Sequence, residues 1–426
     1  MKRQFTCILC IALMVFTVNL FAAGTTEKST EKVTIRYPHW FFGHGGNFEQ
    51  WINGAVDGFE KKYPNVHVER EQVPYDTYWD KLDTGLASGN PPDVAAFWFN
   101  LRKYIEAGAL MPLNDLIDMN DVNKNFSPFQ TKSIPEAAPD GKTYGLAFDT
   151  GFYLPMYRPS VFRSAGIAKY ATDLDEFFTQ SQKLMTKDRY GYAFVTQAGN
   201  WGEQIINLST WTIALGGHWG DTKGRPTLDS KEVIQAVTYL KKLFDMGAVP
   251  KDVAHGDFRK MFATGHVGTL IDGVWVYGLA NGWDPETKTD FATAPLPFPT
   301  QRVAGFYECN SIFKACKHPK EAAALIQFIS NDEQQQKIAE MPHFPARTSI
   351  FTPALKKTLI ERWPWYAEYI NHAGNGVPMS PLSMGGEQMV ETQKIWGKYF
   401  DKVLFENMDP KEAMTVAQKE AMALVK

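Results

Sequence analysis

Cysteine is scarce in this sequence of 426 residues, which contains only four cysteines. Two of them, Cys309 and Cys316, lie beyond the N-terminal segment. The stretch between them resembles a strand and, at about 3.3 Å per residue, would hold them roughly 20 Å apart. That separation is far beyond disulfide reach, and a bridge would need a sharp bend. The two cysteines also lack neighbouring histidine ligands, so we expect no cysteine-based zinc site.

The sequence also has no excess of positive charge. Lysine and arginine total 44 residues against 47 aspartates and glutamates, a formal net charge of −3 at pH 7. No basic stripe stands out along the chain. Because nucleic-acid binding depends on clustered positive charge, we expect no nucleic-acid partner.

Long hydrophobic runs are missing except near the N-terminus, where Ile8 to Val18 is apolar. That run is too short to span a bilayer. It follows Lys2 and Arg3 and ends near the small residues before Gly24, which is the pattern of a signal peptide. We therefore expect residues 1–23 to be removed after Ala23. No cysteine follows the run as a lipid anchor, so the mature protein is expected to be exported, periplasmic and unanchored.

Aromatic residues, in contrast, are abundant, with 12 tryptophans and 17 tyrosines. Each combines an apolar face with a polar tip, which suits a wet binding cleft but also an ordinary core. The stretch YPHWFFGHGG, residues 37–46, places three adjacent aromatics on a connecting loop and predicts either a buried hinge or a binding surface. His39 and His44 share that loop without a third ligand, so we expect no metal there.

Periodicity in the first hundred residues predicts alternating strands and helices. Strands are expected at 33–37, 66–73 and near 94–97, with helices after a cap at Asn47 and over 76–88. This alternation is typical of an α/β layer with a largely parallel sheet. Ligands bind at the carboxyl ends of such strands, where the 37–46 loop and the Trp98–Asn100 segment both lie.

Several phrases then follow one another in a characteristic order. They are SGNPPDV, AGALMPLNDLI, DGKTYGLAFDTGFYLPMYRPSVFRSAGI, TDLDEFFTQSQKLM, FATGHVGTLIDGVW, KHPKEAAALIQFIS and MPHFPARTS. From about residue 30 to the end, the chain resembles the extracellular solute-binding proteins of ABC importers, in the family that carries maltose and other sugars.

The resemblance implies a two-lobed α/β periplasmic-binding-protein fold with a hinge and a ligand cleft between the lobes. The first lobe would comprise residues 24–147 plus 296–344, and the second would comprise residues 148–295 plus 345–426. The chain would cross between them near Phe148, near the Pro-rich stretch 295–299 and near Phe344–Pro345.

The resemblance and the local patterns together suggest a set of ligand-binding residues. Trp275, in the phrase DGVW, matches a position where the maltose-binding branch stacks a sugar ring, and Asp149 matches a cleft carboxylate. The candidates are Trp40, Phe41, Trp98, Asn100, Asp149, Trp201, Gly273, Trp275 and Arg347. Each has a structural alternative: the tryptophans and Phe41 could be core, Asp149 could brace the hinge, and Arg347 could form a salt bridge.

Two departures from the family pattern concern the cleft. The usual Tyr-Asn-Lys after the first crossing is Tyr157-Arg158-Pro159 here. A small, glycine-rich stretch expected after the second crossing is replaced by GFYECNS, in which Glu308 could re-shape one wall.

The leading hypothesis is a monomeric receptor, not an enzyme and without cofactor, that captures a saccharide by hinge closure. It would deliver the saccharide, an oligosaccharide by our expectation, to the permease subunits of an ABC importer. One alternative is an exported glycoside-acting enzyme, for which Asp149, Asp272 and Glu308 are the available acids. Another is a receptor for a polyol phosphate such as glycerol 3-phosphate, which predicts more cleft cations than Arg158 and Arg347.

Overall fold

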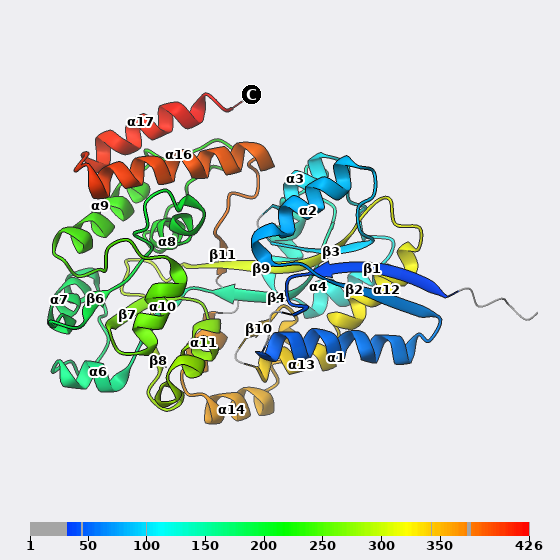
Figure 1. Cartoon of the computed structure of the whole chain (residues 1–426), viewed down its shortest axis with the longest axis horizontal. Coiled ribbons are helices and arrows are strands. Elements are labelled where there is room, and N and C mark those ends of the chain that lie inside the picture. Colours follow the sequence, from blue (N-terminus) through cyan, green and yellow to red (C-terminus); the bar gives the residue numbers. More distant parts are fainter. Residues whose placement is uncertain (1–31, 44–45, 99, 342, 373–375, 426) are drawn as a thin grey trace, which may run out of the picture.

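The computed structural model describes residues 32–43, 46–98, 100–341, 343–372 and 376–425. The predicted signal peptide, His44 and Phe99 lie outside these residues. Two bodies of helices and strands lie side by side, joined by the long strands β4 (Leu146–Phe152) and β9 (Val303–Ile312) (Figure 1). We call the body that contains β1 the first lobe and the body that contains β7 the second lobe.

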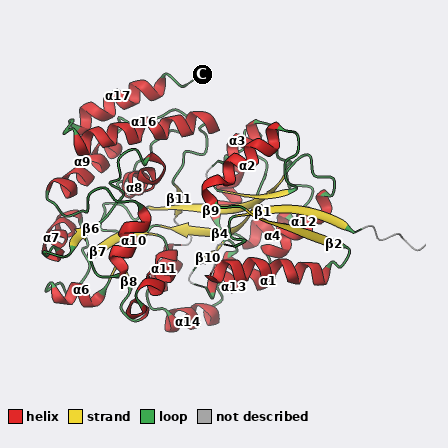
Figure 2. Ribbon diagram, viewed as in Figure 1, coloured by secondary structure: helices red, strands yellow, loops and turns green. Residues whose placement is uncertain are grey.

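The first lobe forms around β1 (Val33–His39), β2 (Val66–Gln72) and β3 (Val94–Phe97). β1 and β2 pair in parallel, as the alternation of strand and helix predicts. Helices cover these strands (Figure 2). They are α1 (Gly46–Lys62), α2 (Tyr75–Ala87), α3 (Leu101–Glu106), α4 (Met119–Asn125), α12 (Pro319–Ile329) and α13 (Asp332–Ala339).

Helix α1 shows how the sequence pattern becomes packing. Its apolar residues recur every three or four positions, so they line one face of the helix. All of them are buried: Phe48, Trp51, Ile52, Ala55, Val56 and Phe59. The predicted cap at Asn47 is wrong, because the helix already begins at Gly46, which takes a left-handed φ of +72° that glycine tolerates.

The second lobe contains a four-stranded sheet in the order β6 (Tyr190–Tyr192), β7 (Val267–Asp272), β5 (Leu154–Tyr157) and β8 (Ala292–Thr293). Its main helices are α6 (Pro159–Ser164), α7 (Leu174–Leu184), α8 (Trp201–Ala214), α9 (Lys231–Asp245), α10 (His255–Ala263) and α11 (Trp275–Trp283). The C-terminal helices α16 (Gly386–Phe405) and α17 (Pro410–Met422) pack against this lobe (Figure 1). The two helices are separated by a break between Phe405 and Pro410.

The remaining helices complete the described chain. They are α5 (Ile134–Glu136), α14 (Pro353–Arg362), α15 (Tyr366–His372), the π-helix η1 (Phe129–Ser133), and the 3₁₀-helices η2 (Pro285–Lys288) and η3 (Thr348–Ile350). No helix within the described ranges is both long and apolar enough to cross a membrane.

Strand β9 links the two lobes through its partners. Its C-terminal half pairs with β3 of the first lobe, and its N-terminal end pairs with β11 (Gly376–Pro378). Along its other edge, β9 pairs with the antiparallel strand β4, and β10 (Phe344–Pro345) pairs with β4. The expectation of a largely parallel sheet is therefore wrong at the junction, because β9 returns from the second lobe in the opposite direction to β3 and β4.

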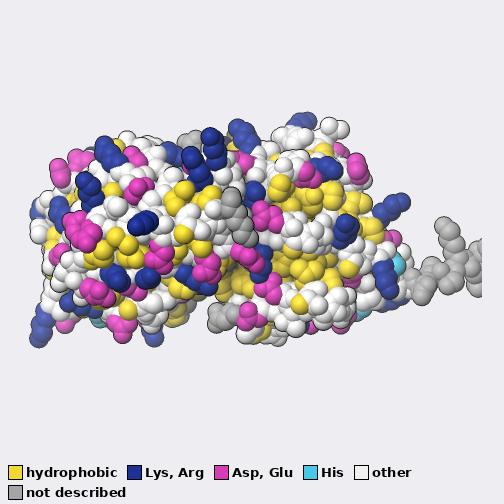
Figure 3. Space-filling view, turned by 90° about the horizontal axis from the view of Figure 1, so that it is seen from above, with side chains coloured by type: hydrophobic (Ala, Val, Ile, Leu, Met, Phe, Trp, Pro, Cys, Tyr) yellow, Lys and Arg dark blue, Asp and Glu magenta, His cyan; other side chains and the backbone are white. Residues whose placement is uncertain are grey.

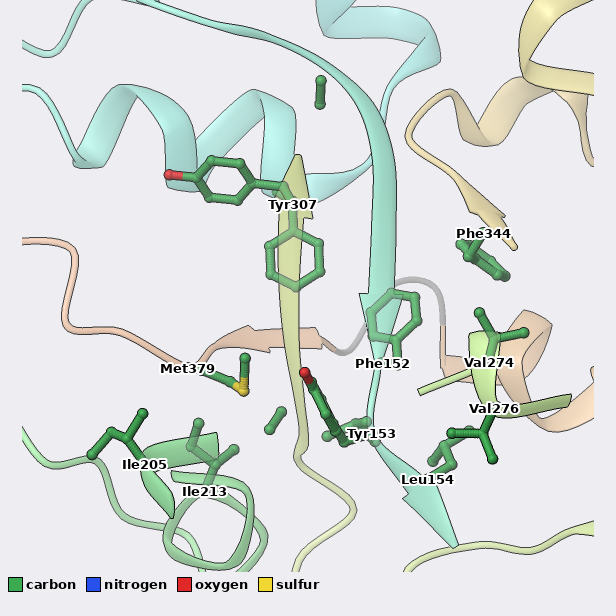
Figure 4. Close-up of a cluster of buried hydrophobic side chains, with 14 of the residues drawn as sticks. Phe152, Tyr153, Leu154, Ile205, Ile213, Val274, Val276, Tyr307, Phe344 and Met379 are labelled. Carbon is green, nitrogen blue, oxygen red and sulfur yellow. The ribbon is translucent and has the colours of Figure 1, made fainter. Parts of the chain in front are cut away.

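The junction has its own apolar core. Every residue of β4 is buried, and Phe152 contacts Phe344 of β10 with ring centroids 5.3 Å apart (Figure 4). Tyr307 of β9 and Met379 lie on the other side of the strand pair in the same view. Cys309 of β9 and Cys316 beyond it are both buried and free.

Candidate functional site

Aromatic rings from both lobes meet on β9. Trp98, which follows β3, lies with its ring centroid 5.9 Å from that of Phe306. Trp275, the first residue of α11, lies 5.5 Å from the same phenyl ring. Tyr153 completes the group, 5.5 Å from Trp275 and 6.3 Å from Phe306. We call these four residues the ring cluster.

Two glycines leave the space that the ring cluster needs. A Cβ on Gly273 would lie 1.9 Å from the Trp275 indole, so only glycine lets that ring fold back over the strand end. A Cβ on Gly151 would lie 2.2 Å from the Phe306 ring and 3.0 Å from Trp275. The predicted site residue Gly273 therefore shapes the position of Trp275.

The aromatic loop at 37–46 packs into the first lobe. Trp40 is only 5% exposed and contacts Tyr75 and Tyr78 edge to face, at 5.7 and 4.8 Å. Phe41 is 8% exposed and lies 4.3 Å from Phe48 of α1. Trp40 reaches the ring cluster through Tyr75, whose hydroxyl accepts a hydrogen bond of 3.1 Å from Trp98 Nε1. The loop thus packs inside the first lobe and supports Trp98 through Tyr75.

Two carboxyl groups lie next to the ring cluster on the joining strands. Asp149 of β4 is the direct partner of Glu308 on β9, and Glu308 shares a strand face with Phe306 because side chains alternate. Burial raises the pKa of Asp149 well above its usual value. Burial, and then the charge of Asp149, also raise the pKa of Glu308.

His343 lies beside this pair. Its Nδ1 lies 3.6 Å from Asp149 Oδ2, but burial lowers the histidine pKa to about 3. The imidazole is therefore neutral at pH 7 and does not balance the carboxylate charge. Asp149 Oδ1 and Glu308 Oε2 are buried and accept no hydrogen bond from any described residue.

A third acid, Asp272 at the end of β7, is already paired. Arg259 donates two hydrogen bonds to it, 2.7 Å from Nε to Oδ2 and 2.9 Å from Nη2 to Oδ1. The same guanidinium lies 5.8 Å from the centre of the Trp275 ring, a cation–π distance. This ion pair therefore supports Trp275 from the second lobe.

Three other candidates have different surroundings. Asn100 is 6% exposed at the start of α3, and its buried Oδ1 has no partner among described residues. Trp201 begins α8, where Lys394 of α16 lies 5.7 Å from its ring. Arg347 is hydrogen-bonded through both Nη atoms to Asp121, at 2.6 Å each, and through Nε to Asp332. Neither Trp201 nor Arg347 is brought to the ring cluster.

A narrow pocket opens between Trp98, Phe306 and the segment at 378–384. Its cavity volume is about 40 Å³. Small-molecule sites usually enclose roughly 300–1,000 Å³, so this pocket, which Trp98 and Phe306 line and Trp275 does not, is too small for a sugar ring. No group of three or more metal-ligating side chains is found in the part of the chain that the structure describes.

Sequence reasoning did not select Tyr75, Tyr153, Phe306 or His343. The strand-like run was predicted only between Cys309 and Cys316, whereas β9 already begins at Val303 and so places Phe306 on the same face as Glu308. Tyr75 and His343 come from separate segments, and only the tertiary fold brings them to the site.

Comparison with known proteins bears on the fold and the family. The family model described as "Bacterial extracellular solute-binding protein" matches residues 45–336. A putative binding protein of Brucella abortus is 24% identical over 296 residues, which is 67% of this chain and 70% of that protein. A lactose-binding protein of Rhizobium radiobacter is 22% identical over 57% of each chain. Maltose-bound MalE3 of T. maritima has a TM-score of 0.78 at 20% identity and covers 92% of this chain and 100% of that one.

The chain therefore has the α/β periplasmic-binding-protein fold. It belongs to the bacterial extracellular solute-binding protein family, whose members act outside the cytoplasm as receptors of ABC transporters. Family membership excludes the alternative of a glycoside-acting enzyme, because these proteins bind their ligands without chemical conversion.

Proposed function

We propose that this receptor binds a saccharide between Trp98 and Trp275 and passes it to the permease subunits of an ABC importer. The observation that carries the proposal is the convergence of rings from both lobes on Phe306. Weakly apolar CH faces of a sugar pack well on aromatic rings. Its hydroxyls would pair with the buried acceptors of Asp149, Glu308 and Asn100, because unmatched buried polar groups are costly.

The named relatives support a saccharide as the ligand class. One is a lactose-binding protein, and the T. maritima protein was solved with maltose. The aromatic surface running from Trp98 to Trp275 is suited to more than one sugar ring, which favours an oligosaccharide.

A polyol phosphate fits the site less well. A phosphate group needs cations with unoccupied donors, and the two arginines beside the ring cluster are already bound to acids. Arg259 contacts Asp272, and Arg102, which lines the pocket beside Trp98, contacts Glu106. Arg158 and Arg347, the two candidates from the sequence, are also bound to acids, Arg158 to Asp284 and Asp290 and Arg347 to Asp121 and Asp332. The carboxyls of Asp149 and Glu308 would also repel the phosphate.

Closure about the joining strands is the proposed binding motion. The lobes would be residues 24–147 plus 296–344 and residues 148–295 plus 345–426, with β4, β9 and β10 at the crossings. Because the ring cluster already leaves little space, the lobes must separate to admit a ligand and close around it. Small-angle scattering of a monomer should then show a smaller radius of gyration with ligand than without it.

The mature protein is proposed to begin after Ala23 and to carry no lipid. Intact-mass measurement of the exported protein tests this directly. A mass that matches residues 24–426 supports the proposal, and an added diacylglyceryl mass contradicts it.

A tryptophan-fluorescence screen tests the ligand class. Purified receptor would be titrated with neutral mono- and oligosaccharides, amino sugars, glycerol 3-phosphate and glycerophosphocholine. We expect a saturable change with at least one saccharide, since two cluster residues are tryptophans. A response to the phosphate compounds alone would reject the saccharide assignment.

A further inference from the structure

The carboxyls of Asp149 and Glu308 form an unusual pair for the floor of a cleft. They are opposite each other on adjacent antiparallel strands, a position that sets Cβ atoms about 4.5–5.5 Å apart. Asp149 is only 2% exposed. Neither side chain forms an ion pair with a lysine or arginine within the described ranges. Glu308 is partly buried. Like charges held this close and shielded from water cannot both persist without a compensating group.

The neighbouring elements supply no positive charge at neutral pH. The titratable groups that face the pair are His343 before β10, Tyr366 of α15, Tyr37 of β1, Tyr78 of α2, Tyr153 and Cys309. The tyrosines and the cysteine are neutral at pH 7 because burial raises the pKa of each, and burial keeps the imidazole neutral.

Buried polar atoms without a hydrogen-bond partner among the described residues cluster around the carboxyl pair. Asp149 Oδ1 and Glu308 Oε2 are buried acceptors without a donor among described residues. Asn310 lies two residues from Glu308 on the same face of β9, is 0% exposed, and has an Nδ2 without an acceptor there. Its Oδ1 accepts a 2.7 Å hydrogen bond from the Tyr37 hydroxyl, so its orientation is fixed.

We propose that the saccharide carries a primary ammonium group, which binds between the Asp149 and Glu308 carboxyls while the ring cluster packs on the sugar. This inference rests on the proposed saccharide site and narrows its ligand to an amino sugar. Asn310 Nδ2 would donate to a neighbouring sugar hydroxyl.

The number of hydrogen-bond donors that the carboxyl pair needs favours a primary ammonium group. A primary ammonium brings three N–H donors and a full positive charge, so it satisfies both orphan acceptors and balances the pair. A sugar hydroxyl brings one donor and no charge. A quaternary ammonium brings charge but no donor, so it would leave both carboxyl oxygens unpaired. The nearby rings of Phe306 and Tyr153 would add cation–π attraction to a primary ammonium.

Matched ligand pairs test the inference by calorimetry on the mature receptor at pH 7. The pairs are glucosamine and glucose, galactosamine and galactose, mannosamine and mannose, and the β-1,4-linked glucosamine dimer and cellobiose. We expect at least one amino sugar to bind tenfold or more tightly than its neutral partner. Its affinity should rise with pH until the amine loses its proton, because protons on the carboxyl pair compete with the ammonium.

Two variants locate the effect. Glu308→Gln keeps the shape of the side chain and removes its charge, so the amino-to-neutral affinity ratio should fall at least tenfold. Glu333→Gln on α13, whose side chain is 68% exposed, is the matched control and should leave the ratio unchanged.

The possible outcomes distinguish a failure of the amino-sugar inference from a failure of the proposed saccharide-receptor function. Neutral sugars that bind as tightly as every amino partner would overturn the inference and leave the saccharide receptor standing. Glycerophosphocholine binding more tightly than any amino sugar would also overturn it. No binding by any saccharide would reject both proposals.

Discussion

Trp98 and Trp275 contact the same phenyl ring, that of Phe306, from the two lobes of the molecule. Phe306 belongs to β9, which pairs with β3 of the first lobe near its C-terminal end and with β11 near its N-terminal end. Opening or closing the lobes must therefore change the spacing of these three rings. The site and the motion proposed for it share one set of residues.

Trp275→Ala should weaken saccharide binding about tenfold to a hundredfold. Loss of ring stacking and apolar contact costs roughly 1–3 kcal/mol, and each 1.4 kcal/mol is tenfold. The free energy of unfolding should change little, because Trp275 is only partly buried. Calorimetry and urea unfolding measure the two quantities.

Trp211→Ala is the matched control for that variant. Trp211 is 0% exposed in the second-lobe core, and removing a buried large ring costs about 3–5 kcal/mol of stability. A similar stability loss in Trp275→Ala would show that Trp275 is a core residue.

Gly151→Ala should disturb the ring cluster. The added methyl group would overlap Phe306, and overpacking typically costs about 1–3 kcal/mol. We expect lower stability and weaker binding together. Gly54→Ala in α1, where a Cβ meets nothing within 4 Å, should instead stabilise the protein by about 0.5–1 kcal/mol and leave affinity unchanged. Unchanged binding by Gly151→Ala would contradict the described ring positions.

Arg347→Ala should lower stability and spare ligand binding. Its guanidinium holds Asp121 and Asp332, and hydrogen bonding to Arg347 lowers the pKa of Asp121. Asp121 and Asp332 are partly exposed, so after solvent screening we expect a loss of about 1–3 kcal/mol. A tenfold loss of affinity with normal stability would return Arg347 to the list of ligand-binding residues.

The carboxyl pair should make the unliganded receptor less stable as pH rises. Folding raises the pKa of Asp149 and Glu308 above their ordinary values of 3.8 and 4.5, so the folded state holds their protons more tightly than the unfolded state. Their contribution is most favourable below pH 3.8 and is lost progressively as pH climbs toward the folded-state values.

Urea unfolding of the wild type and Glu308→Gln, from pH 4.5 to 7.5, measures this effect. The variant should lose less stability than the wild type over that range, because one titrating group is gone and Asp149 no longer faces a second charge. Parallel curves for the two proteins would show that the carboxyls are not coupled.

Much of the fold could be predicted from local sequence. The buried face of α1 follows from spacing alone, and the break before Pro410 follows from a residue that cannot continue a helix. The direction of β9 could not be predicted, because strand pairing between residues more than 150 positions apart depends on the path of the chain, not on periodicity.

The candidate site was predictable where a residue ends a strand and much less so elsewhere. Trp98 and Trp275 follow β3 and β7 closely, and both rings contact Phe306. Trp40 looked equally suitable, but its ring turns into the first lobe against Tyr78. Side-chain direction on a loop depends on neighbours from distant segments, and these leave no local signal.

A double-mutant cycle on Trp98 and Trp275 tests the central claim most directly. The affinity of the tightest-binding saccharide would be measured by calorimetry for the wild type, Trp98→Ala, Trp275→Ala and the double variant, with folding checked by circular dichroism. Each single variant should weaken binding at least tenfold, and the double variant should bind more weakly than either single variant. Folded variants that both bind the saccharide as tightly as the wild type would contradict a site shared between the lobes.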